Sequence, residues 1–457
     1  MKVEVVVISK EIIRPSSPTP DHLRTYQLSF LDQISPPVYN PLKSLSNVLT
    51  QFYPLAGRAQ GNLFIDCNDQ GIPYLETRVK CQLSDVIQNP IPIELNKFIP
   101  FQVDEVADIS FGVQLNIFEC GGIALGMCIS HKIADALSFF NFIKTWAATA
   151  RQQGDHIVCP QFVSAKLFPP KNISGFNPRV GITRENIVTR MFVFEASKIE
   201  ALKTKYGAGD HSKSLENHQK PPSRVEALSA FIWDRFMAAT QVKSDIAPKR
   251  FYAIVHAVNL RTRIDPPLPE HSFGNLYRFA MTIPSLDTGE ECYGLVRQVR
   301  DQVKKIDKNY VEKLQKGSEH LDFIKQRSDN VFKGEMVTMS FTSLCRFPLY
   351  EADFGWGNPT WVGSPALTFN NLVVFIDAKS GGGIEAYINM KEEDLDKIEG
   401  DVSVPHATLN YYITNKNFLT SWIILFEGEK QLKGLTLSFY IDVIWIPCIF
   451  FYARLYK

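Results

Sequence analysis

The chain has 457 residues, of which 45% are hydrophobic and 21% charged, and this supply of apolar side chains is sufficient for two domains of ordinary size. Lys plus Arg number 49 and Asp plus Glu 48, so the net charge is +1, which argues against a nucleic-acid partner or binding to an anionic membrane. The eight cysteines include no CxxC pair, which argues against a zinc knuckle or a disulfide scaffold and predicts reduced cysteines in a cytoplasmic protein.

The first third of the chain predicts a strand, a helix and a hairpin. Residues 1–22 alternate apolar and polar side chains without the apolar core of a secretory signal, and we expect an edge strand there. Apolar residues at helical spacing in 41–57 predict a helix that stops before Pro54 and Gly57. Residues 111–131 form two apolar runs around Gly121 and Gly122, the pattern of a hairpin whose second strand ends at His131.

A buried helix is predicted next, over residues 132–149. The stretch 151–190 is rich in Pro and Gly and predicts a long crossover. A second half begins near Met191 and contains a predicted helix at 223–240 and a strand at 251–263. This alternation of strand and helix patterns indicates an α/β protein.

His131 and Asp135 lie four residues apart in "ISHKIADALSFF". A histidine where a strand ends suits a general base, since neutral imidazole can accept a proton near pH 7. No GxSxG elbow or marked Ser or Cys nucleophile accompanies it, so direct attack without a covalent acyl-enzyme is the simpler chemistry. A histidine satisfied within a core and a metal ligand are the alternatives, although a metal needs a third ligand that the local sequence does not supply.

A second motif, DFGWG at 353–357, is far more specific than HxxxD. Together the two motifs resemble the plant BAHD acyltransferases, which acylate alcohols or amines with acyl-coenzyme A. Further stretches occur in that family's order: "LTQFYPLAGR", "CNDQGIPYLE", "SRVEALSAFIW", "VNLRTRIDPPLPEHSFGN" and "GIEAYINMKEEDL". The resemblance covers most of residues 1–409, and within the family the chain looks most similar to the alkaloid-acetylating members.

The resemblance implies an α/β fold of two chloramphenicol-acetyltransferase-like domains with a channel between them. We expect an N-terminal domain over 1–172 with HxxxD, a crossover linker over 173–190 and a C-terminal domain over 191–409 with DFGWG. Residues 410–457 form an atypical apolar tail.

The resemblance also assigns roles to residues of the two motifs. His131 is expected to be the general base, while Asp135 turns away and pairs with Arg261, because a bidentate pair gives rigid geometry. The glycine-rich motif is expected to support channel shape and domain contact through four residues: Asp353, Gly355, Trp356 and Gly357.

Three further residues match family positions near the ligands. Ser223 and Arg224 are expected near the coenzyme A phosphates at the start of a helix, although Ser223 as an ordinary N-cap is an equal alternative. Asn275 is expected to face the channel and to contact the developing oxyanion or the substrate. No metal and no permanently bound cofactor are expected, only acyl-coenzyme A as cosubstrate.

The function implied is acyl-CoA-dependent O-acylation, with acetyl-coenzyme A as donor and a hydroxyl of a plant specialised metabolite, such as an indole alkaloid, as acceptor. Malonyl-coenzyme A is the alternative donor. The alternative function is that of a catalytically impaired homologue or a mis-spliced isoform that acts as a binding protein. We expect a monomer that binds no membrane.

Two departures from the family pattern bear on activity. Relatives carry a further strand before the helix that here begins near Leu42, so a piece of the N-terminal domain is expected to be missing. The apolar tail has no expected partner in the fold and is interpreted as foreign sequence rather than a membrane anchor, because Asp442 at mid-span would cost about 2.5–3.5 kcal/mol on insertion. A chain cut after Asn410 is therefore expected to fold at least as well.

Overall fold

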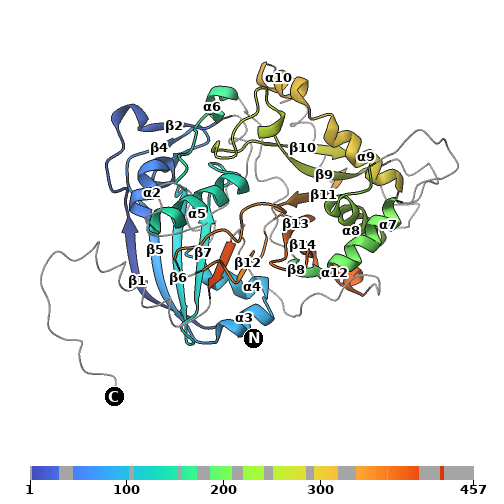
Figure 1. The fold of residues 1–457 in the computed structure, drawn as a ribbon, viewed down its shortest axis with the longest axis horizontal. Helices are drawn as coiled ribbons and strands as arrows, with labels where there is room; N and C mark the ends of the chain where they lie inside the picture. Colours follow the sequence, from blue (N-terminus) through green and yellow to red (C-terminus); the bar gives the residue numbers. More distant parts are fainter. Residues whose placement is uncertain are drawn as a thin grey trace, which may run out of the picture.

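The protein was analysed as a computed structural model, which describes twelve ranges of residues. These ranges are 3–29, 45–101, 108–151, 157–171, 186–207, 220–240, 251–284, 293–316, 336–355, 357–367, 369–400 and 422–426. They form two lobes that lie side by side, each built on a six-stranded mixed sheet (Figure 1). This confirms the expected two-domain α/β architecture.

The sheet of the first lobe takes four strands from the N-terminal part of the chain and two from later segments. Its strands, in spatial order, are β1 (Val5–Ile13), β5 (Ile72–Val79), β6 (Phe111–Phe118), β7 (Ile123–Ile129), β15 (Trp422–Phe426) and β12 (Trp361–Gly363). β1 lies at the edge, and β6 and β7 pair as an antiparallel hairpin. Both elements agree with the sequence prediction.

The sheet of the second lobe is formed within residues 187–391. Its strands, in spatial order, are β10 (Tyr277–Thr282), β9 (Phe251–Asn259), β11 (Met336–Ser343), β13 (Leu372–Asp377), β14 (Ile384–Lys391) and β8 (Ile187–Phe194). A small third sheet consists of β2 (Thr25–Gln27), β4 (Phe64–Asp66) and β3 (Arg58–Gln60).

Helices cover both large sheets. In the first half these are α2 (Leu45–Gln51), α3 (Leu83–Gln88), α4 (Pro92–Leu95), α5 (Ala136–Ala150) and α6 (Ser164–Leu167). In the second half they are α7 (Ala196–Gly207), α8 (Arg224–Thr240), α9 (Tyr293–Lys304), α10 (Lys308–Lys316) and α12 (Glu392–Glu399). α5 and α8 confirm the helices predicted over 132–149 and 223–240, with later starts at Ala136 and Arg224.

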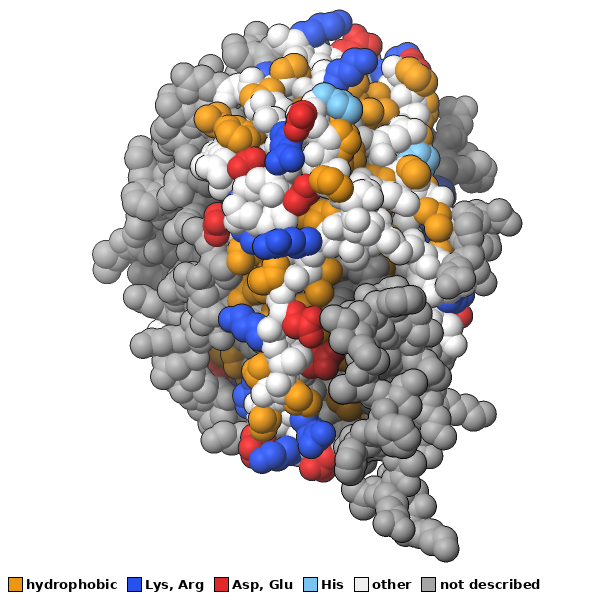
Figure 2. Space-filling view, turned by 90° about the vertical axis from the view of Figure 1, so that its left-hand side faces the viewer, with side chains coloured by type: hydrophobic (Ala, Val, Ile, Leu, Met, Phe, Trp, Pro, Cys, Tyr) orange, Lys and Arg blue, Asp and Glu red, His pale blue; other side chains and the backbone are white. Residues whose placement is uncertain are grey.

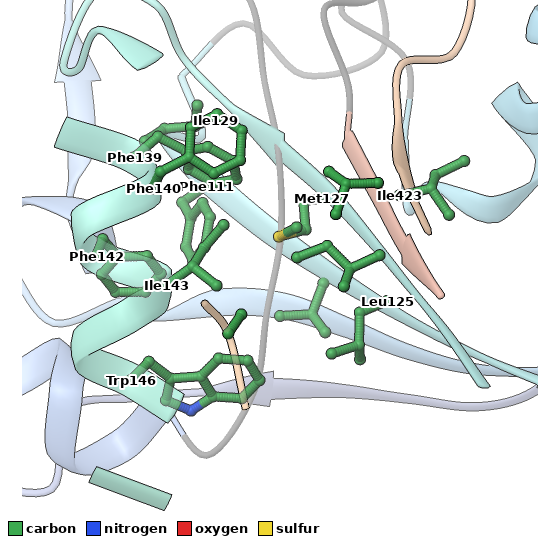
Figure 3. Packing of buried hydrophobic residues seen from close by; sticks show 14 of the residues in the cluster. Phe111, Leu125, Met127, Ile129, Phe139, Phe140, Phe142, Ile143, Trp146 and Ile423 are labelled. Carbon is green, nitrogen blue, oxygen red and sulfur yellow. The ribbon is translucent and has the colours of Figure 1, made fainter. Parts of the chain in front are cut away.

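Helix α5 covers the strands that lead to His131. It presents Phe142, Ile143 and Trp146 to the sheet at the spacing of one helix face (Figure 3). The ring of Phe142 lies 5.3 Å from that of Phe111, edge to face. Every residue of β7 is buried, as expected for a strand with both faces covered.

The C-terminal tail contributes an interior strand, and this corrects the sequence analysis. β15 pairs antiparallel with β7 on one side and with β12 on the other, and its residues 423–426 are fully buried. Figure 3 shows Ile423 beside Met127 in the core. The expectation that residues 410–457 have no partner in the fold is therefore wrong for the five residues of β15. This strand lies between β7 and β12 and joins β12 to the rest of the sheet.

Other expectations lie outside the described residues. Residues 30–44, where a missing strand was predicted, are among them, as is the rest of the tail. The domain boundaries predicted at 172, 190 and 409 remain predictions, and β12 shows that a segment of the predicted second domain lies in the first sheet.

The distribution of charge on the surface agrees with the balanced composition. On the face shown in Figure 2, acidic and basic side chains are interspersed rather than segregated. Within the part of the chain that the structure describes, no helix combines the length and apolarity that crossing a bilayer would require.

The buried strand predicts that the tail is needed for stability. Ile424→Ala should lower the free energy of unfolding by about 2–4 kcal/mol, because it removes buried methyl groups and leaves a cavity. Denaturant unfolding of the full chain measures this loss. Val7→Ala in β1 is the control, because Val7 is 55% exposed, and its free energy of unfolding should change by less than about 0.5 kcal/mol. If Ile424→Ala unfolded at the same denaturant concentration as wild type, β15 would contribute nothing to the stability of the fold.

A buried carboxyl where the lobes meet predicts a pH dependence. Glu385 of β14 is 7% exposed and burial raises its pKa to about 7, although the polar groups of Trp361 and Tyr387 act to lower it. The folded state therefore holds this proton more tightly than the unfolded state, so the associated stability is present below about pH 4.5 and is lost as pH rises through about 7.

Glu385→Gln should remove this loss. Relative to wild type it should gain stability between pH 5 and pH 8, by up to about 3 kcal/mol. Thermal unfolding across that range measures the difference, and Glu119→Gln, at an exposed position, is the matched control. Parallel pH curves for wild type and Glu385→Gln would contradict the argument.

Candidate active site

His131 lies in the turn between β7 and α5, two residues beyond the end of the strand. The residue keeps partial contact with solvent, and its ring centre lies 5.6 Å from that of Tyr277, the first residue of β10. The imidazole therefore belongs to the first lobe but faces a residue of the second. This position agrees with the predicted strand end and excludes a histidine sealed in the core.

Asn275 makes two hydrogen-bond contacts with His131. Its Oδ1 lies 2.9 Å from Nδ1 of the imidazole, and its Nδ2 donates to the backbone carbonyl of His131 over 2.6 Å. The side chain is fully buried. The sequence predicted Asn275 as a substrate or oxyanion contact, and the structure instead directs its amide to the histidine.

Asp135 forms a buried bidentate ion pair with Arg261, as predicted. Arg261 donates from Nη1 to Oδ2 over 2.8 Å and from Nη2 to Oδ1 over 3.0 Å, and the two residues are 7% and 2% exposed. Asp135 is also the N-cap of α5, because Oδ1 accepts from the backbone N–H of Ser138. The carboxylate thus fixes the start of the helix and the position of the arginine.

The loop Ser272–Leu276 closes this network. The Ser138 hydroxyl accepts from the backbone N–H of Gly274 and donates to its carbonyl, each over 3.1 Å. The backbone N–H of Leu276 donates to Asp135 over 3.1 Å, and Arg261 donates to the carbonyl of Ser272 over 2.8 Å. Gly274 has a φ of +129°, and a Cβ there would lie 2.6 Å from the Ser164 hydroxyl, so only glycine fits.

The pKa of each titratable group follows from this arrangement. Burial lowers the pKa of the His131 imidazole, and a hydrogen bond with its own backbone, the charge of Asp135 and the hydrogen bond with Asn275 offset this only in part. Burial alone would raise the pKa of the Asp135 carboxyl, but the charge and hydrogen bonds of Arg261 and the bonds from Ser138 lower it below its ordinary value. Near pH 7 the site therefore holds a neutral imidazole beside a charged, internally compensated ion pair.

The DFGWG segment attaches to the far end of α5. Asp353 pairs with Arg151, which follows the last residue of the helix, over 3.0 Å. Its other oxygen accepts from the backbone N–H groups of Gly355 and Gly357, both at a φ of +95°. Trp356 lies outside the described residues. The motif thus stands away from His131 and ties a turn of the second half to the helix that follows this histidine.

The predicted phosphate contacts lie at the start of α8. Ser223 and Glu226 form a reciprocal capping pair, in which Glu226 accepts from the N–H of Ser223 and the Ser223 hydroxyl accepts from the N–H of Glu226. Arg224 pairs with Asp377 over 2.7 Å. The N-cap alternative for Ser223 is therefore observed, and a role in coenzyme A binding remains a prediction.

The structure brings together some of the predicted residues and adds others. His131, Asp135, Arg261 and Asn275 form one network, while the DFGWG and α8 residues lie elsewhere. Sequence reasoning missed Ser138 and Gly274. An aspartate directly before a helical pattern is an N-cap signal, which could have indicated that a residue in the first turn of α5 accompanies Asp135. Within the described part of the chain, no cluster of three His, Cys, Asp or Glu side chains could hold a metal ion.

Comparisons with known proteins point to one family. Residues 40–404 match a family model described as the Transferase family. Stemmadenine O-acetyltransferase of Catharanthus roseus is 38% identical over 431 residues, which cover 88% of this chain and 97% of that protein. Vinorine synthase of Rauvolfia serpentina is 34% identical over 425 residues, which cover 86% of this chain and 96% of that protein.

Solved structures share the fold. The crystal structure of vinorine synthase aligns with a TM-score of 0.72 at 31% identity, covering 89% of this chain and 100% of that one. F. sporotrichioides TRI101, in a complex with coenzyme A and T-2, aligns with a TM-score of 0.64 at 16% identity, covering 84% of this chain and 99% of that one. At that identity the second likeness concerns the fold alone.

The buried ion pair predicts a large loss of stability when one partner is removed. Asp135→Ala should lower the free energy of unfolding by about 3–5 kcal/mol, because it leaves the Arg261 charge buried and unpaired. Denaturant unfolding measures this against Asp21→Ala, which breaks the exposed pair of Asp21 with Arg24 and should cost less than about 1 kcal/mol. Similar losses in the two variants would exclude the structural role assigned to Asp135.

Proposed function

The chain belongs to the BAHD family of plant acyltransferases, and from this premise we propose that it transfers an acetyl group from acetyl-coenzyme A to a hydroxyl of a polycyclic plant metabolite. An indole alkaloid is the proposed acceptor class, and His131 is the proposed general base.

The reaction needs one base and no covalent acyl-enzyme. The acceptor oxygen attacks the thioester carbonyl carbon while its proton moves to the imidazole of His131. The C–O bond forms, the C–S bond breaks and the coenzyme A thiolate leaves, taking the proton back from the imidazolium. The products are the ester and free coenzyme A, so the imidazole is regenerated in its neutral form.

The observation that carries this proposal is the state of the imidazole. His131 is partly exposed, its pKa is lowered by burial, and Asn275 of the other lobe holds it in place. The hydrogen bonds of Asp135 run to Ser138, Arg261 and Leu276 rather than to the ring. A neutral imidazole at a strand end, held from a second lobe, suits the removal of a proton from a bound alcohol.

A face of β10 supports an apolar ring system as acceptor. Arg278, Ala280 and Thr282 are buried on one side of this strand. On the other side, Tyr277 lies next to His131, and Phe279, 40% exposed, contacts Tyr277 edge to face with ring centres 5.3 Å apart. Aromatic side chains in this arrangement offer an apolar surface that begins at the base. The name of stemmadenine O-acetyltransferase agrees with such an acceptor.

The donor is proposed by analogy with relatives. An O-acetyltransferase at 38% identity favours acetyl-coenzyme A over malonyl-coenzyme A, and a structure of the same fold is described as a complex with coenzyme A. We assign the coenzyme A phosphates to the start of α8, near Arg224, although its pairing with Asp377 means that a phosphate would have to share or displace that partner.

His131→Ala should reduce turnover by about 10²- to 10⁴-fold, because only the base is lost, while binding of coenzyme A stays within about twofold of wild type. Thiol release from acetyl-coenzyme A across a panel of polycyclic alcohols, together with calorimetric titration of coenzyme A, measures both. His22→Ala, at an exposed histidine, is the control. If the wild-type protein bound coenzyme A but acylated no alcohol of the panel, the alternative of a catalytically impaired homologue would be favoured.

The pH profile gives an independent check. The base must be neutral to act, and burial lowers its pKa, so kcat/KM should fall on the acid side with a midpoint below about pH 6.5, the ordinary value for histidine. A midpoint well above that value would exclude the imidazole of His131 as the titrating group.

A further inference from the structure

Asn275 meets two different groups of His131 with one amide. Its Nδ2 lies 2.6 Å from the backbone carbonyl oxygen of His131, and its Oδ1 lies 2.9 Å from the ring Nδ1. The carbonyl oxygen can only accept, so the amide must turn its NH₂ toward it, because the reverse orientation would oppose two acceptors. The backbone of His131 therefore fixes the orientation of the Asn275 side chain.

That orientation determines where the imidazole carries its hydrogen. With the NH₂ turned to the carbonyl, the amide presents an acceptor, Oδ1, to Nδ1. A neutral imidazole holds one N–H and one bare nitrogen, and only an N–H at Nδ1 forms a bond with that acceptor.

We infer that Asn275 is a positioning residue that sets the tautomer of His131: the hydrogen is at Nδ1 and the lone pair that accepts the substrate proton is at Nε2. This rests on the proposed function and deepens it, and it gives Asn275 a role beside the oxyanion or substrate contact expected from the sequence. Both observed contacts of Asn275 with His131 are with the ring and the backbone of the histidine, so its effect on the reaction passes through the ring.

The Asp135–Arg261 pair acts on the base through the same residue. Gly274 and Leu276, which flank Asn275, are held by Ser138 and Asp135, and Arg261 donates to the carbonyls of Ser272 and Gly274. The network thus fixes the backbone on both sides of Asn275. Asp135 controls the imidazole without contacting it, because it holds the loop that presents the amide.

The tautomer can be read directly from the full-length protein. In long-range ¹⁵N–¹H NMR spectra of histidine-labelled protein above pH 7.5, the His131 signals, assigned by their loss in His131→Gln, should show a protonated Nδ1 and a bare Nε2. In Asn275→Ala this preference should weaken. A wild-type ring protonated at Nε2 would overturn the inference, and this readout does not depend on any substrate.

Kinetics of an isosteric variant separate positioning from folding. Asn275→Asp places a carboxylate beside Nδ1, stabilises the imidazolium and should move the acid limb of kcat/KM to higher pH by about one unit or more. Asn275→Ala should lower kcat on the order of 10- to 100-fold, with KM for acetyl-coenzyme A within about twofold of wild type.

The matched control is Asn62→Ala. It removes an amide whose oxygen accepts a hydrogen bond from Lys132, the residue after His131, over 2.9 Å, and it should leave the pH profile unchanged. An unshifted acid limb in folded Asn275→Asp would refute the positioning role. If wild type turns over no alcohol, the proposed function fails while the NMR result still decides the tautomer.

Discussion

The buried ion pair of Asp135 and Arg261 is the contact on which the rest of the site depends. Its carboxylate comes from the turn after β7 in the first lobe, and its guanidinium from the turn after β9 in the second. Removing two charges from water costs several kcal/mol for each, which only good geometry and further hydrogen bonds can offset. Here the bonds that offset it cap α5 and hold the loop around Asn275, so one pair joins the lobes and shapes the site.

Helix α5 links the turn that holds His131 to the DFGWG segment. Its first turn is fixed by Asp135 and its last by the pair of Arg151 with Asp353. The Phe354 ring packs against Trp146 of the helix and lies 6.0 Å from the ring of Phe426 in β15. The DFGWG motif, remote from His131, is therefore anchored to the same helix. It also lies beside a strand from beyond residue 404, where the family match ends.

Sequence patterns predicted what depends on near neighbours. The 111–131 hairpin, α5, α8 and the place of His131 at the strand end follow from local periodicity and from glycine and capping signals. The capping pair of Ser223 with Glu226 was also present as S-x-x-E. β15 could not be placed this way. "WIILF" fits a short buried strand, but its partners β7 and β12 are distant in sequence, and no local pattern specifies pairing at that distance. The contact of the Asn275 amide with His131 could not be predicted for the same reason, because the two residues are distant in sequence.

The electrostatics explain why the Asp135 carboxylate suits the proposed role of His131 by bonding to other groups rather than to the imidazole. A carboxylate bonded to the imidazole would favour the imidazolium and raise its pKa, which would leave less neutral base near pH 7. Because Arg261 compensates the charge of Asp135, burial is the largest influence on His131 and its pKa falls. Orientation is then left to a neutral group, the amide of Asn275, which can fix the hydrogen at Nδ1 without adding charge. If His131 acts as the proposed base, an imidazole that is both oriented and uncharged thus requires the carboxylate and the amide to occupy the positions observed.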